Sequence, residues 1–157
     1  TVGVGAVVYA DLSRFREKNI VFTWDKMMNL KGDSSPYIQY SFARAKSILE
    51  KAGGEEKFSK VNFQDINEFT KEEENLILKL SEFPEIVLQA KDLGRPDKIA
   101  AYLNELAQEF GRFYENVSVL NAENENLRNL RLTLVKSTAQ VIKNGLNLLG
   151  IKVLEKM

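Results

Sequence analysis

The sequence contains no cysteine and no histidine. Without cysteine, the chain cannot form a disulfide, bind a metal through thiolates or supply a thiol nucleophile. Without histidine, it has no imidazole base, no Ser-His-Asp triad and no histidine-based zinc site. We therefore expect no metal site, and any catalysis would depend on Asp, Glu, Lys or Tyr. The lack of cysteine is typical of a reducing compartment, and we expect a cytoplasmic protein.

Long hydrophobic runs and an overall charge are also absent. The longest apolar segment, Val2–Ala10, is too short to span a bilayer, so we expect no membrane partner. The 22 Lys and Arg residues equal the 22 Asp and Glu residues, which argues against binding to DNA through many phosphates. With 157 residues, of which 44% are hydrophobic and 28% charged, the composition is that of one globular domain.

Charge is nevertheless distributed unevenly along the chain. Glu55–Glu74 carries three Lys against six Glu and one Asp, whereas Glu125–Met157 carries six basic residues against two Glu. A polyanion would be attracted to the second segment and repelled by the first. A solvated surface of mixed charge explains the same counts, and the counts alone favour it.

Apolar residues recur at helical spacing through most of the chain, which predicts an all-α fold of the helical-bundle type. The predicted helices cover 2–18, 36–51, 70–94 with a break at Pro84, 97–116 and about 123–149. We expect 20–24 to be extended or to begin a loop, and 54–69 to be a connecting loop.

Several local signals predict where these helices begin and end. Ser35 is the expected N-cap of the second helix, and Thr70 and Glu73 form a capping box for the third. Gly94 and Gly150 are the expected C-terminal stops.

Four apolar stripes are expected to face the core. In the first helix the stripe is Val4, Val7, Val8, Leu12 and Phe15, and in 97–116 it is Ile99, Leu103, Leu106, Phe110 and Phe113. The last helix has two stripes, so we expect neighbours on both sides of it: Leu127, Leu130, Leu134, Val141 and Leu148, then Leu132, Val135, Ile142 and Leu149.

One constellation is of a kind that could bind a nucleotide. Tyr40 and Arg44 are four residues apart on a predicted helix and therefore lie on one face. A ring can stack on an unpaired base while a guanidinium reaches a phosphate or a base edge. A tyrosine at the edge of a bundle, beside an arginine paired with a neighbouring helix, is the structural alternative, and without further information that alternative is favoured.

The motif Ser35-Pro36-Tyr37-Ile38-Gln39-Tyr40-Ser41-Phe42-Ala43-Arg44 resembles arginyl-tRNA synthetase, a class I enzyme, in the region just after the catalytic fold. The resemblance spans nearly the whole chain and is weakest over 54–69. It continues through these segments: 3–7, 22–25, 102–107, 110–115, 131–132, 145–151 and Met157. Since the sequence begins inside an apolar segment without Met, we expect a piece of a longer polypeptide.

The resemblance implies a division of the chain and a function. Residues 1–34 would connect from the catalytic fold, and 35–157 would form the helical anticodon-binding domain. The whole enzyme would be an ATP-dependent arginine–tRNA ligase using magnesium. The adenylate-forming signatures of the family are a His-Ile-Gly-His-like segment and a Lys-Met-Ser-Lys-Ser-like loop. This fragment has no segment of the first kind, and Lys26-Met27-Met28 lacks the second lysine and the serine of the loop. We therefore expect no catalytic residue and no cofactor in the fragment, an arginine-accepting tRNA as its partner, and a monomer.

The resemblance also implies the residues that bind the anticodon loop. These are Tyr40, Arg44, Phe110 and Tyr114, with Met157 placed close by. Phe110 also belongs to an apolar stripe, so packing in the core is at least as good an explanation for it. The alternative function is a helical module that binds another protein. A hydrolase based on Glu72, Glu73 and Glu74 is disfavoured, because adjacent glutamates on a helix point in different directions.

Overall fold

The computed structural model describes residues 1–15, 23–30, 32–54, 61–66 and 68–157. Within these ranges it is entirely helical, which confirms the predicted fold class. The elements are α1 (Val2–Leu12), α2 (Trp24–Met27), α3 (Ser35–Lys51), the short 3-10 helix η1 (Phe63–Asp65), α4 (Lys71–Ser81), α5 (Phe83–Leu93), α6 (Pro96–Asn116) and α7 (Glu125–Leu148). No helix in this described part is long and apolar enough to cross a membrane.

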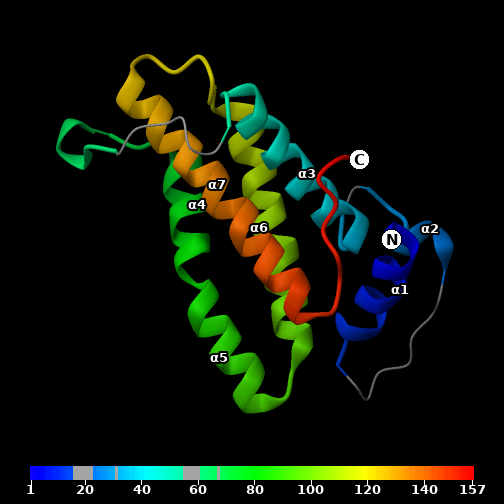
Figure 1. Ribbon diagram of the computed structural model, residues 1–157. Coiled ribbons are helices and arrows are strands. Elements are labelled where there is room, and N and C mark those ends of the chain that lie inside the picture. The colour runs from blue at the N-terminus through cyan, green and yellow to red at the C-terminus, as the bar shows by residue number, and fades with distance from the viewer. Residues whose placement is uncertain (16–22, 31, 55–60, 67) are drawn as a thin grey trace.

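Helix α6 is the centre of the bundle. It packs against α4 and α5 on one side and against α3 and α7 on the other, and it also touches α1 (Figure 1). The stripe predicted for it is confirmed, because all of its members are buried: Ile99, Leu103, Leu106, Phe110 and Phe113. Burying so many large apolar side chains is the main stabilising contribution of this helix.

Helix α7 packs against α3, α4 and α6, as its two apolar stripes predicted. Gly145 allows the closest approach, because a Cβ at this position would lie 2.6 Å from Leu103 Cδ2. One stripe is wholly buried: Leu132, Val135, Ile142 and Leu149. The prediction for Leu148 in the other stripe is wrong, since this side chain is 57% exposed. It is the last residue of α7 and stands at the rim of a shallow hollow beside the turn between α5 and α6.

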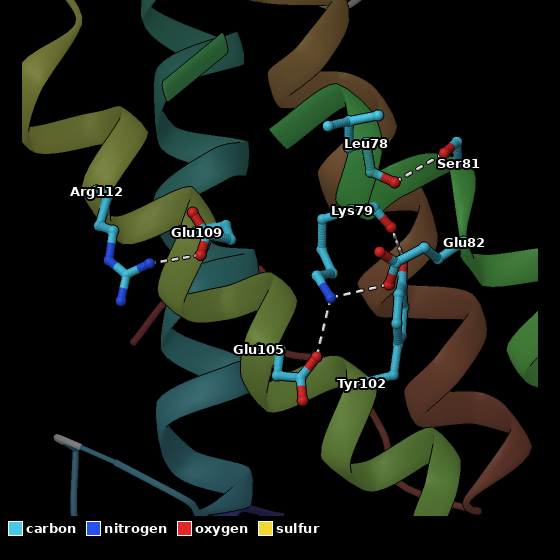
Figure 2. Close-up of polar contacts among 8 residues, drawn as sticks. All are labelled: Leu78, Lys79, Ser81, Glu82, Tyr102, Glu105, Glu109 and Arg112. Atoms are coloured by element: carbon cyan, nitrogen blue, oxygen red, sulfur yellow. Dashed lines mark hydrogen bonds and ion pairs between the residues drawn. The ribbon is translucent and has the colours of Figure 1, made fainter. Parts of the chain in front are cut away.

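The break between α4 and α5 occurs where Pro84 predicted it, and α6 holds it in place. The Tyr102 hydroxyl of α6 donates to the Lys79 carbonyl at 2.8 Å (Figure 2). Lys79 Nζ donates to Glu82 Oε2 at 2.8 Å and to Glu105 Oε2 at 2.9 Å. These contacts supply partners for backbone and side-chain groups at the point where the helix is interrupted.

The predicted capping box at the start of α4 is confirmed, and it has a further connection. The Thr70 amide donates to Glu73 Oε2 at 2.7 Å, and the Glu73 amide donates to Thr70 Oγ1 at 3.2 Å. The other carboxylate oxygen of Glu73 accepts from Arg131 Nε of α7 at 2.7 Å. Glu73 is 1% exposed, so this ion pair is a buried link between α4 and α7.

The face of α1 that packs on the bundle is only partly the predicted one, because Val8 and Leu12 of the stripe pack against the core but Val4 and Val7 do not. Val4 is 70% exposed and Val7 is 44% exposed, whereas Gly5 and Tyr9 are buried. Gly5 allows close approach, because a Cβ there would lie 3.1 Å from the buried side chain of Ile151. The Tyr9 hydroxyl donates to Asp33 Oδ1 at 2.6 Å and lies 3.1 Å from the Ala100 carbonyl oxygen.

Three predicted boundaries also differ from the structure. Helix α1 ends at Leu12 rather than Lys18, although 16–22 lie outside the described residues. The N-cap of α3 is Ser34 and not Ser35, because the extended backbone of Ser34 lets its Oγ accept from the Tyr37 amide. Trp24 begins the short helix α2; the rest of the predicted extended segment, apart from Thr23, is not described.

Candidate functional site

Helix α3 presents Tyr40 and Arg44 on its outer face. Ser34 caps the first turn, and Pro36 stands within it, where the missing N–H leaves no bond unmade. The core side of α3 carries apolar residues that are almost completely buried, and they include Ile38 and Ala45. Tyr40 and Arg44 are only partly buried, so a molecule in solvent can reach both.

The Arg44 guanidinium lies between two aromatic rings. Its carbon is 4.7 Å from the centroid of the Tyr40 ring and 4.4 Å from the centroid of the Tyr114 ring, which belongs to α6. Arg44 Nη2 also donates to the Tyr40 hydroxyl at 2.9 Å. Cation–π contacts of this kind hold the guanidinium in place, and Arg44 stays partly accessible to solvent. The structural alternative requires an ion pair between Arg44 and a neighbouring helix, and Arg44 forms none with the residues that the structure describes.

The two predicted site residues on α6, Phe110 and Tyr114, have different environments. Tyr114 is 44% exposed and stands beside Arg44. Phe110 is 0% exposed, and its ring stacks on Phe113 with the centroids 6.4 Å apart. In this structure Phe110 is therefore a core residue, and the site proposed below does not include it. Phe110 is buried because it belongs to the apolar stripe of α6, which faces the core.

The C-terminal tail, which follows α7, returns alongside α3 (Figure 1). Gly150 adopts a positive φ of 72°, which lets the chain reverse direction after the helix. Ile151 is buried, and Gln39 Nε2 of α3 donates to the Lys152 carbonyl at 2.7 Å. These two anchors fix the direction of the tail, and Met157 reaches the surface next to Tyr40 and Arg44.

Together these elements line a cleft of about 430 Å³. Four of the predicted site residues contribute to its wall: Tyr40, Arg44, Tyr114 and Met157. The wall also contains charged residues that were not predicted as part of the site: Glu50, Lys51, Glu155 and Lys156. Lys51 could have been found from the sequence, because it follows Arg44 by seven residues and shares its helical face.

A hydrogen bond of Tyr37 joins the two helices that carry Arg44 and Tyr114. The Tyr37 hydroxyl donates to the Ala107 carbonyl of α6 at 3.3 Å, which ties α3 to α6. Burial raises the pKa of Tyr37, and the nearby Arg44 charge partly opposes this effect. The hydroxyl therefore remains a protonated donor at neutral pH.

The cleft combines three chemical abilities. Tyr114 is 44% exposed, so its ring is accessible for stacking on a planar group. The edge of Arg44 can donate two parallel hydrogen bonds to a phosphate or to a base. The carboxylates of Glu50 and Glu155 can accept hydrogen bonds from amino groups. An aromatic platform beside a cation is the arrangement that proteins use for single-stranded nucleic acid.

Comparison with known proteins places the chain among anticodon-binding proteins. Residues 38–157 match the DALR anticodon binding domain, and the chain belongs to this family. An arginine–tRNA ligase from Clostridium kluyveri is 43% identical over 157 residues, which are 99% of this chain and 27% of that protein. An arginine–tRNA ligase from Clostridium beijerinckii is 44% identical over 156 residues, with the same shares of the two chains.

Solved structures of arginyl-tRNA synthetases have the same fold. The enzyme from Thermus thermophilus superposes with a TM-score of 0.91 at 36% identity, over 99% of this chain and 26% of that one. The enzyme from Plasmodium falciparum gives a TM-score of 0.80 at 33% identity, over 99% and 27%. The resemblance stated from the sequence is thereby confirmed, and the chain spans about a quarter of the length of these relatives.

Proposed function

We propose that the cleft binds an unstacked base of the anticodon loop of an arginine-accepting tRNA. The observation that carries this proposal is the stack of Tyr40, Arg44 and Tyr114 at the mouth of an open cleft. Bases of a loop expose both their faces and their edges, whereas the narrow major groove of an A-form stem hides its base edges from side chains. A stacking cleft therefore suits a loop better than a stem.

The positions of the rings indicate how a base would be held. Since the guanidinium of Arg44 already occupies the space between the two rings, the base would stack on the outer face of Tyr114. Arg44 would then donate to the base edge or to the adjoining phosphate. Met157, which is 50% exposed, would cover the base from the side of the tail.

The neutral charge of the chain fits recognition of this kind. Binding through counterion release alone would need many unpaired cations, and the 22 basic residues here are matched by 22 acidic ones. The affinity would instead come from a few stacked and hydrogen-bonded contacts, which distinguish one loop sequence from another.

The wider proposal concerns the whole enzyme. We propose that the chain serves as the anticodon-binding part of an arginine–tRNA ligase that uses ATP and magnesium, with residues 1–34 as the connection to the catalytic fold and 35–157 as the domain itself. Binding the anticodon at a distance would position the acceptor end for catalysis. We further propose a monomer that acts in the cytoplasm, since the lack of cysteine is typical of a reducing compartment.

Titration of the chain with arginine tRNA, and with transcripts altered only in the anticodon, tests the proposal. We expect the unaltered tRNA to bind more tightly than the altered transcripts, because only the loop bases differ. Equal binding to all transcripts would reject anticodon recognition by this chain. A single sharp elution volume at the monomer position in size-exclusion chromatography would support the proposed oligomeric state.

A further inference from the structure

A second hollow lies on the other side of the C-terminal tail. It has a volume of about 160 Å³ and is formed between α3, α7 and the tail. Its rim carries three lysines, Lys46 of α3 with Lys136 and Lys143 of α7, and Glu155 is the acidic residue among those that line it. The function proposed above makes no use of this hollow.

Helical spacing explains why the lysines converge. Lys136 and Lys143 are seven residues apart and lie on one face of α7, and Ala139 between them forms part of the buried floor. Lys46 follows the buried Phe42 by one turn on α3. The apolar floor fixes where the lysine stems begin, and Lys136 and Lys143 are both exposed residues.

The hollow adjoins the anticodon cleft. Glu155 of the tail lines both the hollow and the cleft, and α3 also contributes residues to both. The tail itself is held on α3 by the hydrogen bond from Gln39 to the Lys152 carbonyl. A strand whose base enters the cleft would therefore pass close to the three lysines.

We infer that this hollow binds the phosphodiester backbone of the RNA whose base occupies the cleft. This inference rests on the proposed function, and it assigns Lys136 and Lys143 the role of phosphate contacts. Such contacts carry no sequence information, but they fix the register of the RNA. Three ammonium groups around one carboxylate leave a net positive charge, and lysine binds phosphate as a point charge without a demand for fixed geometry. Lys46 and Lys136 also take part in contacts within the protein. The experiment below therefore tests the positive charge at the hollow and does not require any of these lysines to lack a partner.

The salt dependence of tRNA binding tests this inference. The double variant Lys136→Gln/Lys143→Gln should lower the slope of log affinity against log salt concentration by about 1.4 to 1.8, because each lost phosphate contact removes about 0.7 to 0.9. The affinity for every transcript should fall by the same factor, so the preference for the unaltered anticodon should remain. Lys136→Arg/Lys143→Arg keeps the charge and should keep the slope of the wild type.

A matched control removes two lysines elsewhere. Lys71 of α4 and Lys91 of α5 have side chains that are each 78% exposed, and neither lines the cleft or the hollow. Lys71→Gln/Lys91→Gln changes the net charge equally and should leave the slope near that of the wild type. An unchanged slope in Lys136→Gln/Lys143→Gln, or an equal loss in the control, overturns the inference while leaving anticodon preference as a separate result. If the wild-type protein binds all transcripts equally, the proposed function is instead rejected.

Discussion

Arg44 and Tyr114 lie on different helices and are 70 positions apart in the sequence, yet the guanidinium carbon of Arg44 stands 4.4 Å from the centre of the Tyr114 ring. This contact joins α3 to α6, as does the hydrogen bond from Tyr37 to the Ala107 carbonyl. The candidate site is therefore built across two helices that the core already holds together, so the ring and the guanidinium are positioned before any ligand arrives.

The exposed ring of Tyr114 should contribute directly to tRNA binding. We expect Tyr114→Ala to weaken binding by about 1–3 kcal/mol, or about 5- to 150-fold, which is the usual range for a base stacked on an aromatic ring. Tyr114→Phe keeps the ring and should stay close to the wild type. Fluorescence anisotropy with labelled tRNA measures both, and an Ala variant that binds as tightly as the Phe variant would contradict stacking.

The planar shape of Arg44 should matter as well as its charge. Arg44→Lys keeps the positive charge but cannot place a flat group between Tyr40 and Tyr114. We expect its tRNA affinity to be close to that of Arg44→Ala, and well below that of the wild type, in the same anisotropy titration. A wild-type tRNA affinity of the Arg44→Lys variant would mean that the cleft uses only the charge of this residue.

Phe110 and Tyr114 should behave in opposite ways when truncated. Phe110→Ala removes a fully buried ring, so we expect the free energy of unfolding to fall by about 3–5 kcal/mol. Tyr114→Ala should change stability much less, because its side chain is 44% exposed. Urea denaturation followed by circular dichroism measures both values. If Phe110→Ala instead has the stability of the wild type but binds tRNA more weakly, Phe110 contacts the tRNA and belongs to the site.

Alkaline pH should weaken the fold through Tyr102. Burial raises the pKa of Tyr102 above the ordinary value of 10.0, and the negative charge of Glu82 adds to this effect. Above pH 10 the unfolded chain therefore releases this proton before the folded protein does, so stability is complete below pH 10 and falls as the pH rises further.

Urea unfolding measured between pH 8 and pH 11 tests this expectation. Tyr102→Phe should reduce the loss of stability above pH 10 by up to about 1.4 kcal/mol per pH unit. Some loss should remain, because burial also raises the pKa of Tyr9. Identical pH profiles for Tyr102→Phe and the wild type would show that this hydroxyl ionises equally in both states.

The sequence predicts the parts of this structure that depend on local signals. The stripe of α6, the capping box of Thr70 and Glu73, and the break at Pro84 each follow from spacing or from the chemistry of one helical turn. The shared face of Tyr40 and Arg44 was predictable for the same reason.

The remaining features depend on contacts between distant segments. The spacing predicted that Val4 and Val7 would be buried together with Val8 and Leu12, but the packed face is centred nearer Gly5, where the missing side chain allows close approach, and it leaves Val4 and Val7 exposed. No periodicity indicates that the tail folds back onto Gln39, or that it separates the cleft from the lysine hollow. Tyr114 entered the predicted site through the family resemblance, and its contact with Arg44 is visible only in three dimensions.

The ratio of affinities for arginine tRNA and for anticodon-altered transcripts, measured with the variant Tyr40→Ala/Arg44→Ala/Tyr114→Ala, tests the central claim most directly. The account predicts a ratio near one for this variant, while Lys71→Gln/Lys91→Gln keeps the wild-type ratio and both proteins retain the wild-type circular dichroism. A triple variant that is folded and still prefers the unaltered anticodon as strongly as the wild type would contradict the account, because the bases would then be read somewhere else.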